Sequence, residues 1–132
     1  MNFSNLIISW YKDNKRNLPW RETSDPYLIW LSEIILQQTR VDQGLPYYLK
    51  FSSIYPSIEL MANEKEEQIL KHWQGLGYYS RARNMHATAK HIAFNLAGEF
   101  PRTFKEIKQL KGVGDYTAAA IASFSFNEKR AV

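Results

Sequence analysis

Hydrophobic residues recur with helical periodicity along most of the chain. Near the N-terminus, Phe3, Leu6, Ile7, Trp10 and Tyr11 follow this spacing and predict a helix with one apolar face. No segment shows the alternation of apolar and polar residues that is typical of a half-buried strand, and no internal repeat is evident. The pattern therefore predicts an all-α fold, a compact array of helices.

Polar residues and prolines mark where the next helices begin and end. Asp25 followed by Pro26 is typical of an N-cap and a first helical position, so a helix is predicted from Pro26 through Leu36. Thr39 is the predicted cap of the following helix. That helix should bend or stop near Pro46, because proline lacks the backbone N–H that the helix needs.

Two further helices are predicted in the middle of the chain. Asn63 with Glu66 has the pattern of a capping box, and Gly75 is the predicted stop of the helix that it starts. A second helix should run over about residues 80–97 and end at Gly98. These signals place a glycine-rich connection between two helices.

A tight turn near the C-terminal end has the strongest chemical signature of the chain. Thr103 with Glu106 predicts another helix start, and residues 110–116 then form a hairpin in front of an alanine-rich helix. Gly112 and Gly114 allow the backbone to turn tightly and to approach a ligand without a Cβ. The unpaired N–H groups of the following helix suit a phosphate. A simple turn between packed helices remains the alternative.

Composition limits the function classes. The chain has 132 residues, of which 45% are hydrophobic, so one domain with a real core is expected. The net charge of +4 permits a polyanionic partner without requiring one. Cysteine is absent, which excludes disulfides and thiolate metal sites within these residues. No apolar run approaches the roughly 20 residues of a membrane span, so an intracellular protein with no membrane partner is expected.

One acid stands out on the helix that begins at Pro26. The spacing places Trp30, Glu33, Gln37 and Arg40 on one face, and leucines and isoleucines surround the glutamate in sequence. A carboxyl group among apolar residues has a raised pKa and can act as a general acid. A solvent-facing glutamate on an amphipathic helix is the alternative. Likewise, residues 37–39 either read base edges or simply end the helix.

The connection over residues 73–83 combines flexible backbone with rings and cations. Leu76 is expected to be exposed and Tyr78 to be free to stack, so both are candidates for insertion between bases. Arg81 and Arg83 at the start of the next helix are candidate phosphate contacts. A glycine-rich linker with core tyrosines is the alternative.

Taken together, these blocks resemble one family, the MutY-type A/G-specific adenine DNA glycosylases of the helix-hairpin-helix superfamily. The matching blocks, in the family's order, are Leu18-Pro19-Trp20-Arg21, Trp30 through Thr39, Gly75 through Arg83, and the hairpin followed by Tyr116-Thr117-Ala118. The resemblance implies one truncated catalytic domain over residues 1–132. An N-terminal helix and basic loop would occupy 1–25, and a six-helix domain 26–132, with the hairpin at 110–116.

The resemblance implies an activity and a role for each site residue. Such enzymes flip out an adenine mispaired with 8-oxoguanine or guanine in double-stranded DNA and hydrolyse its N-glycosidic bond. Glu33 matches the acid that protonates adenine N7. Tyr116 stands where relatives with lyase activity have a lysine, so a monofunctional enzyme is expected. Arg16, Trp20, Arg21 and Leu36 match the adenine pocket, and Gln37, Gln38, Thr39, Leu76 and Tyr78 match residues that contact the substrate, mainly near the oxidised guanine.

The resemblance also implies how the DNA backbone is held. Phosphates would lie against Arg81, Arg83, Gly112, Val113 and Gly114. A cation would be bound by the carbonyl groups of Lys108, Leu110 and Val113. The complete protein is expected to be a monomer.

Two departures from the family limit these expectations. Lys111 replaces the usual hairpin proline. The family's catalytic aspartate, the four cysteines of its 4Fe-4S cluster and its C-terminal domain would all follow Val132, and the chain ends on two apolar residues. We therefore expect a fragment that is inactive alone. Two alternatives stay open: a sister glycosylase that removes thymine opposite guanine, and a non-catalytic DNA-binding module.

Overall fold

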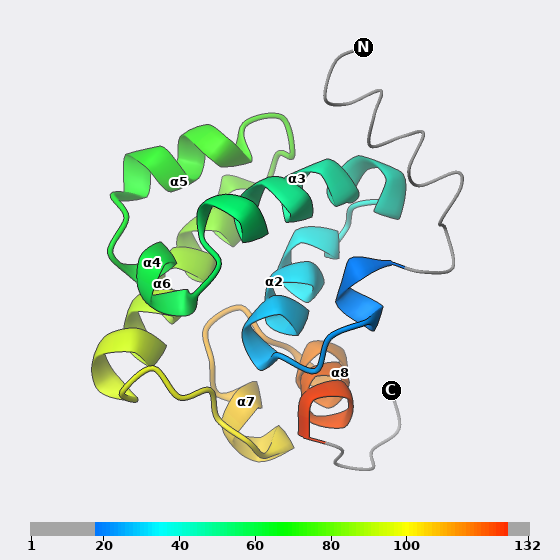
Figure 1. Ribbon diagram of the computed structural model, residues 1–132, viewed down its shortest axis with the longest axis vertical. Coiled ribbons are helices and arrows are strands. Elements are labelled where there is room, and N and C mark those ends of the chain that lie inside the picture. Colours follow the sequence, from blue (N-terminus) through cyan, green and yellow to red (C-terminus); the bar gives the residue numbers. More distant parts are fainter. Residues whose placement is uncertain (1–17, 127–132) are drawn as a thin grey trace.

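The computed structural model describes residues 18–126, and every regular element in that range is helical. The expected N-terminal helix and Arg16 lie outside the described residues. The elements follow one another along the chain as shown in Figure 1. They are the 3-10 turn η1 (Pro19–Arg21) and the α-helices α2 (Pro26–Leu36), α3 (Val41–Ile54), α4 (Ile58–Ala62), α5 (Glu66–Trp73), α6 (Tyr79–Asn95), α7 (Phe104–Lys108) and α8 (Asp115–Phe126).

Helix α2 lies at the centre of the molecule and supplies much of the core. It packs against α3, α6 and α8, while α4 and α5 cover α6, and α7 pairs with α8. In Figure 1, α3 to α6 gather on one side of α2, and α7 and α8 on the other. Trp30, Leu31 and Ile35 of α2 are completely buried. This central position fixes whatever side chains α2 presents at the junction with α8.

Several predicted helix ends are confirmed. Asp25 caps α2, and its carboxylate accepts a hydrogen bond of 2.9 Å from the backbone N–H of Tyr27. Thr103 caps α7 by accepting from the N–H of Glu106 at 3.2 Å. Gly75 follows α5 with a φ of +102°, a backbone conformation that favours glycine.

Other predicted ends are wrong. Arg40, not Thr39, is the N-cap of α3, and α3 continues through Pro46 to Ile54. The packing of α3 against α2 and α5 outweighs the hydrogen bond lost at the proline. The predicted capping box does not form, since the N-cap of α5 is Lys65, which makes no side-chain cap, and the Asn63 side chain donates to the Glu59 carbonyl oxygen at 2.8 Å.

The short helix α4 has no counterpart in the sequence analysis. Ser57 caps it by accepting a hydrogen bond of 3.3 Å from the N–H of Leu60. Five residues are too few to show a helical period, so the only local signal was the serine. Within the described part of the chain, no helix has the length and apolar character needed to cross a membrane.

Candidate active site

Two adjoining hollows open where η1, α2 and α8 meet. Their volumes are about 450 and 440 Å³, within the range of small-ligand sites. Four side chains line both: Trp20, Arg21, Glu33 and Tyr116. Since the first two come from η1 and the others from α2 and α8, the fold gathers residues almost a hundred positions apart.

Each hollow has further walls of its own. The first is also lined by Thr23, Ile29, Ser32 and Phe124, and the second by Leu18, Leu36, Gln37, Thr39, Val41 and Thr117. Of the residues predicted for substrate contact, the structure thus brings Trp20, Arg21, Leu36, Gln37 and Thr39 together with both predicted catalytic residues. Phe124 was missed in the sequence, although it lies eight residues after Tyr116, a spacing that returns to the same face of a helix.

Among the described residues that line the two hollows, Glu33 is the only acidic one. Its side chain is half-buried, and it makes no hydrogen bond or ion pair with any described residue. Burial raises the pKa of its carboxyl above the ordinary value. A half-buried carboxyl with a raised pKa at a cavity wall can hold a proton for transfer to a bound ligand.

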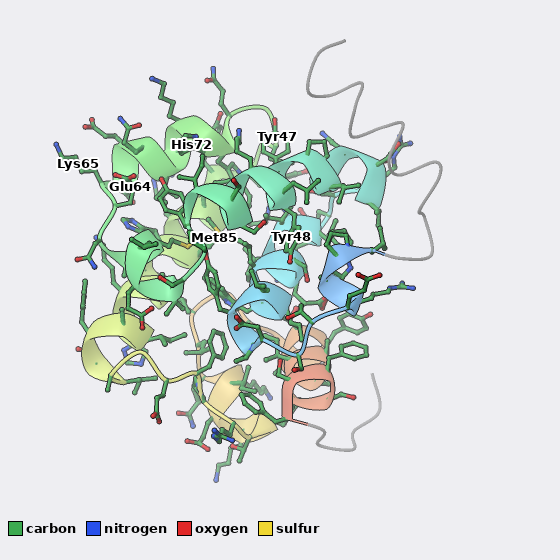
Figure 2. The ribbon with its side chains drawn as sticks, viewed as in Figure 1. Tyr47, Tyr48, Glu64, Lys65, His72 and Met85 are labelled. Carbon is green, nitrogen blue, oxygen red and sulfur yellow. The ribbon has the colours of Figure 1, made fainter. Side chains whose placement is uncertain are left out.

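Of the two aromatic rings that line both hollows, one is packed against the core and the other is exposed. The Trp20 ring packs edge-on against Tyr48, with 5.0 Å between ring centroids and 77° between planes. Figure 2 shows the neighbours Tyr47 and Tyr48 pointing to opposite sides of α3, so Tyr48 faces the core and supports the Trp20 wall. Tyr116, in contrast, is 65% exposed in the first turn of α8. The site therefore combines an anchored ring with an accessible one.

The predicted face of α2 does not form as expected. The helix ends at Leu36, before two of the four residues assigned to that face. Trp30 is completely buried, while Arg40 is exposed and pairs with Asp42 at 2.8 Å. Of the other three, Gln37 lines the second hollow together with Glu33, whereas Trp30 and Arg40 line neither hollow.

The hairpin between α7 and α8 is held from both sides. The Thr88 hydroxyl of α6 donates to the carbonyl oxygen of Lys111 at 3.1 Å, and the Gln37 side-chain amide donates to that of Gly112 at 3.3 Å. Nothing in the sequence pattern had singled out Thr88. Gln37 thus links the end of α2 to the hairpin, a contact that joins the cavity to the turn.

The two hairpin glycines differ. Gly112 has a φ of +79°, a backbone conformation that favours glycine, although a Cβ there would only make ordinary contact with Asn84. Gly114 does not have a positive φ, and a Cβ there would meet no heavy atom within 4 Å. The turn thus uses the conformational freedom of Gly112 and not that of Gly114, and close approach of a ligand stays a prediction for both. Nothing among the described residues requires a glycine at position 114, whereas close approach of an external group would.

The connection after α5 departs most from expectation. Leu76 is buried, with 6% of its surface exposed, and is part of the core rather than a free wedge. The glycine preceding it leaves room for the Tyr47 hydroxyl, which donates to the Gln74 carbonyl oxygen at 2.6 Å. Tyr78, in contrast, is 66% exposed, with a φ of +50°.

The two arginines of α6 have different environments. Arg83 is exposed, as a phosphate contact requires. Arg81 is only 9% exposed and donates to carbonyl oxygens at the end of α2. The predicted phosphate contact at Arg81 therefore does not fit its position. The local sequence could not show this, because its partners lie more than forty residues away.

The residues of this chain do not fit an iron–sulfur cluster. They include no cysteine, and in residues 18–126 no group of three or more His, Asp or Glu side chains is placed to hold a metal.

Comparison with known proteins finds a matching family and similar proteins. The model of the HhH-GPD superfamily base excision DNA repair protein matches residues 31–130. The adenine DNA glycosylase of Buchnera aphidicola subsp. Baizongia pistaciae is 44% identical over 95% of this chain and 36% of its own length. That of Homo sapiens is 38% identical over 98% of this chain and 26% of its own length. The structure of a thermostable thymine-DNA glycosylase is 32% identical with a TM-score of 0.82, covering 98% of this chain and 60% of its own.

The chain belongs to the HhH-GPD superfamily of base excision DNA repair proteins. It spans about a third or a quarter of the length of the two adenine DNA glycosylases.

Proposed function

We propose that this chain forms the base-excising cavity of an adenine DNA glycosylase that acts on adenine mispaired with 8-oxoguanine or guanine. The observation that carries the proposal is Glu33, a half-buried carboxyl without a described partner at the wall of a hollow of ligand size. The identity of the excised base rests on relatives named adenine DNA glycosylase, which match almost the whole chain.

In this proposal the chemistry begins when adenine is flipped out of the duplex into the cavity. Glu33 gives its proton to N7 of the base, so that the C1′–N9 bond can break and its electron pair can leave with adenine. Water then adds to C1′ of the resulting oxocarbenium ion and releases a proton. Reactions of this kind use a second carboxylate to stabilise the cation. Of the lining residues within 18–126, none other than Glu33 carries a carboxylate, and the resemblance assigns that role to an aspartate after Val132.

Other residues orient the substrate. Trp20, Arg21 and Leu36 line the space for adenine. Tyr116 stands at the opening, where a phenol cannot form the Schiff base that a lyase needs, so the enzyme is monofunctional.

Double-stranded DNA would lie across the hairpin and the neighbouring turns. The N-terminus of α8 and Gly114 would meet a phosphate, with Arg83 beside them. The carbonyl groups of Lys108, Leu110 and Val113 would hold a cation there. Thr39, Gln38 and the exposed Tyr78 would contact the base opposite the adenine. The complete protein is proposed to work as a monomer.

A second candidate is the removal of thymine opposite guanine. It is favoured by the solved thymine-DNA glycosylase, which matches 98% of this chain at 32% identity. The adenine DNA glycosylases match at 38–44% identity and therefore carry more weight.

Single-turnover assays with the protein expressed from its complete gene separate the two candidates. Duplexes with 8-oxoguanine·adenine, guanine·adenine, guanine·thymine and thymine·adenine pairs are incubated with excess enzyme, and free bases are separated chromatographically. We expect adenine from the first two duplexes and no thymine from the third. Release of thymine without adenine would replace the proposal by the second candidate.

A further inference from the structure

Arg81 of α6 closes the C-terminal end of α2 although the two lie far apart in sequence. Its Nη1 donates to the carbonyl oxygens of Ile34 and Ile35 at 3.3 and 3.0 Å, and also to that of Gln37. The last carbonyl groups of a helix have no partner within the helix and carry partial negative charge. A buried guanidinium here satisfies several of them at once.

The other half of the same guanidinium reaches the connection after α5. Nη2 donates to the Thr39 hydroxyl at 3.2 Å and to the carbonyl oxygen of Leu76 at 3.5 Å. The guanidinium also lies over the rings of Trp73 and Tyr78, at 5.1 and 5.8 Å from their centroids. A guanidinium spreads five N–H donors over three nitrogens in a rigid plane and so reaches two segments together, whereas a lysine has three donors on one nitrogen and cannot reproduce that geometry.

We propose that Arg81 is a positioning residue that holds residues 37–39 and residues 76–78 in one fixed arrangement. Each segment presents one exposed side chain from left-handed backbone, Gln38 with a φ of +56° and Tyr78 with a φ of +50°. Left-handed backbone at a residue other than glycine costs free energy, so it is found where contacts from the surrounding structure hold it in place. Arg81 thereby sets the distance between the Gln38 and Tyr78 side chains, which must contact the same duplex, without touching the DNA itself.

The inference rests on the proposed function, in which these two segments contact the base opposite the target adenine. Arg81 should therefore control how strongly the enzyme prefers 8-oxoguanine over guanine in that place. This consequence differs from a contribution to stability. A destabilised enzyme has a smaller active fraction and loses rate equally on both substrates, so the ratio of the two rates does not change.

The test compares Arg81→Lys with the wild type in the complete protein. Single-turnover rates are measured on 8-oxoguanine·adenine and guanine·adenine duplexes, with folding checked by circular dichroism. Because misplacement by about 1 Å can cost on the order of 10²-fold in rate, we expect at least a roughly tenfold loss on the first duplex and a clearly smaller loss on the second. Arg83→Lys, an exposed change two residues away, should alter both rates by the same factor.

The outcomes separate the two proposals. Absence of adenine release by the wild type refutes the proposed function. Release by the wild type with an unchanged rate ratio in Arg81→Lys overturns the positioning role alone. If Arg81→Lys does not fold, Arg81→Gln is the second variant: its single side-chain amide can donate to only one of the two segments, so the ratio should fall as well. An unchanged ratio in Arg81→Gln would also overturn the role.

Discussion

Glu33 and Glu64 show how differently this fold treats two carboxyl groups. Glu33, at the cavity, is half-buried without a described partner, and burial raises its pKa. Glu64, between α4 and α5, accepts hydrogen bonds of 2.9 Å from the backbone N–H of Lys65 and from the Tyr55 hydroxyl, and these bonds lower its pKa. Figure 2 shows Glu64 beside Lys65 and His72, on the α5 side of the molecule.

The difference separates a carboxyl group that supports the fold from one that the proposed function uses as an acid. The ionised form of Glu64 is stabilised, because both of its hydrogen-bond donors favour the charged carboxylate. Burial of Glu33 favours the protonated form, and no described residue donates a hydrogen bond to its carboxylate or forms an ion pair with it. An environment that destabilises the charge of an unpaired acid reduces stability at neutral pH, and such sites are where function is concentrated.

The largest effect that would test this comparison is on catalysis. In the complete protein, Glu33→Gln should lower single-turnover adenine release by about 10²–10⁴-fold, the usual contribution of general-acid help, with duplex binding largely kept. Glu64→Gln removes a carboxyl of the same size away from the cavity and should leave the rate per folded molecule unchanged. A loss below about threefold for Glu33→Gln, far less than general-acid help supplies, would remove Glu33 from the acid role.

A smaller effect is expected in the pH dependence. Only the protonated carboxyl can act as an acid, so the release rate should fall as pH rises through the raised pKa of Glu33, approaching tenfold per pH unit above it. Glu64→Gln should keep this slope, and the residual activity of Glu33→Gln should lack it. A wild-type profile that is flat across this region, with chemistry rate-limiting, would contradict the assignment.

The sequence predicted well what depends on neighbouring residues. The start of α2 at Asp25 and Pro26 needs only a carboxylate near the second N–H of the helix, and the turn at Gly75 needs only a permissive backbone. The raised pKa of Glu33 was also expected from the sequence, and burial does raise it, while its role as an acid stays a prediction.

What the sequence did not show depends on contacts across the molecule. Leu76 is apolar in a glycine-rich segment, and only the packed core decides whether it is free or buried. Arg81 and Arg83 are alike in sequence, two residues apart at one helix start. Their different environments follow from the end of α2, which accepts hydrogen bonds from the buried Arg81, while Arg83 is exposed. Local periodicity carries no information about such pairs.

The smallest expected effect is on stability and should have opposite signs at the two glutamates. The raised pKa of folded Glu33 means that its favourable contribution is complete below the unfolded pKa and is lost as pH rises through the folded one. The lowered pKa of Glu64 means that its contribution is present above the unfolded pKa and is lost as pH falls through the folded one.

At pH 7, Glu33→Gln should therefore raise the melting temperature of the DNA-free protein, and Glu64→Gln should lower it. Near pH 4 both differences should shrink. Tyr55→Phe, which removes only the hydroxyl that Glu64 accepts from, should cost about 1 kcal/mol at pH 7. Thermal unfolding followed by circular dichroism at the two pH values measures all three variants. A lower melting temperature for Glu33→Gln at pH 7 would mean that the ionised carboxylate has a stabilising partner, and that the contrast between the two glutamates is wrong.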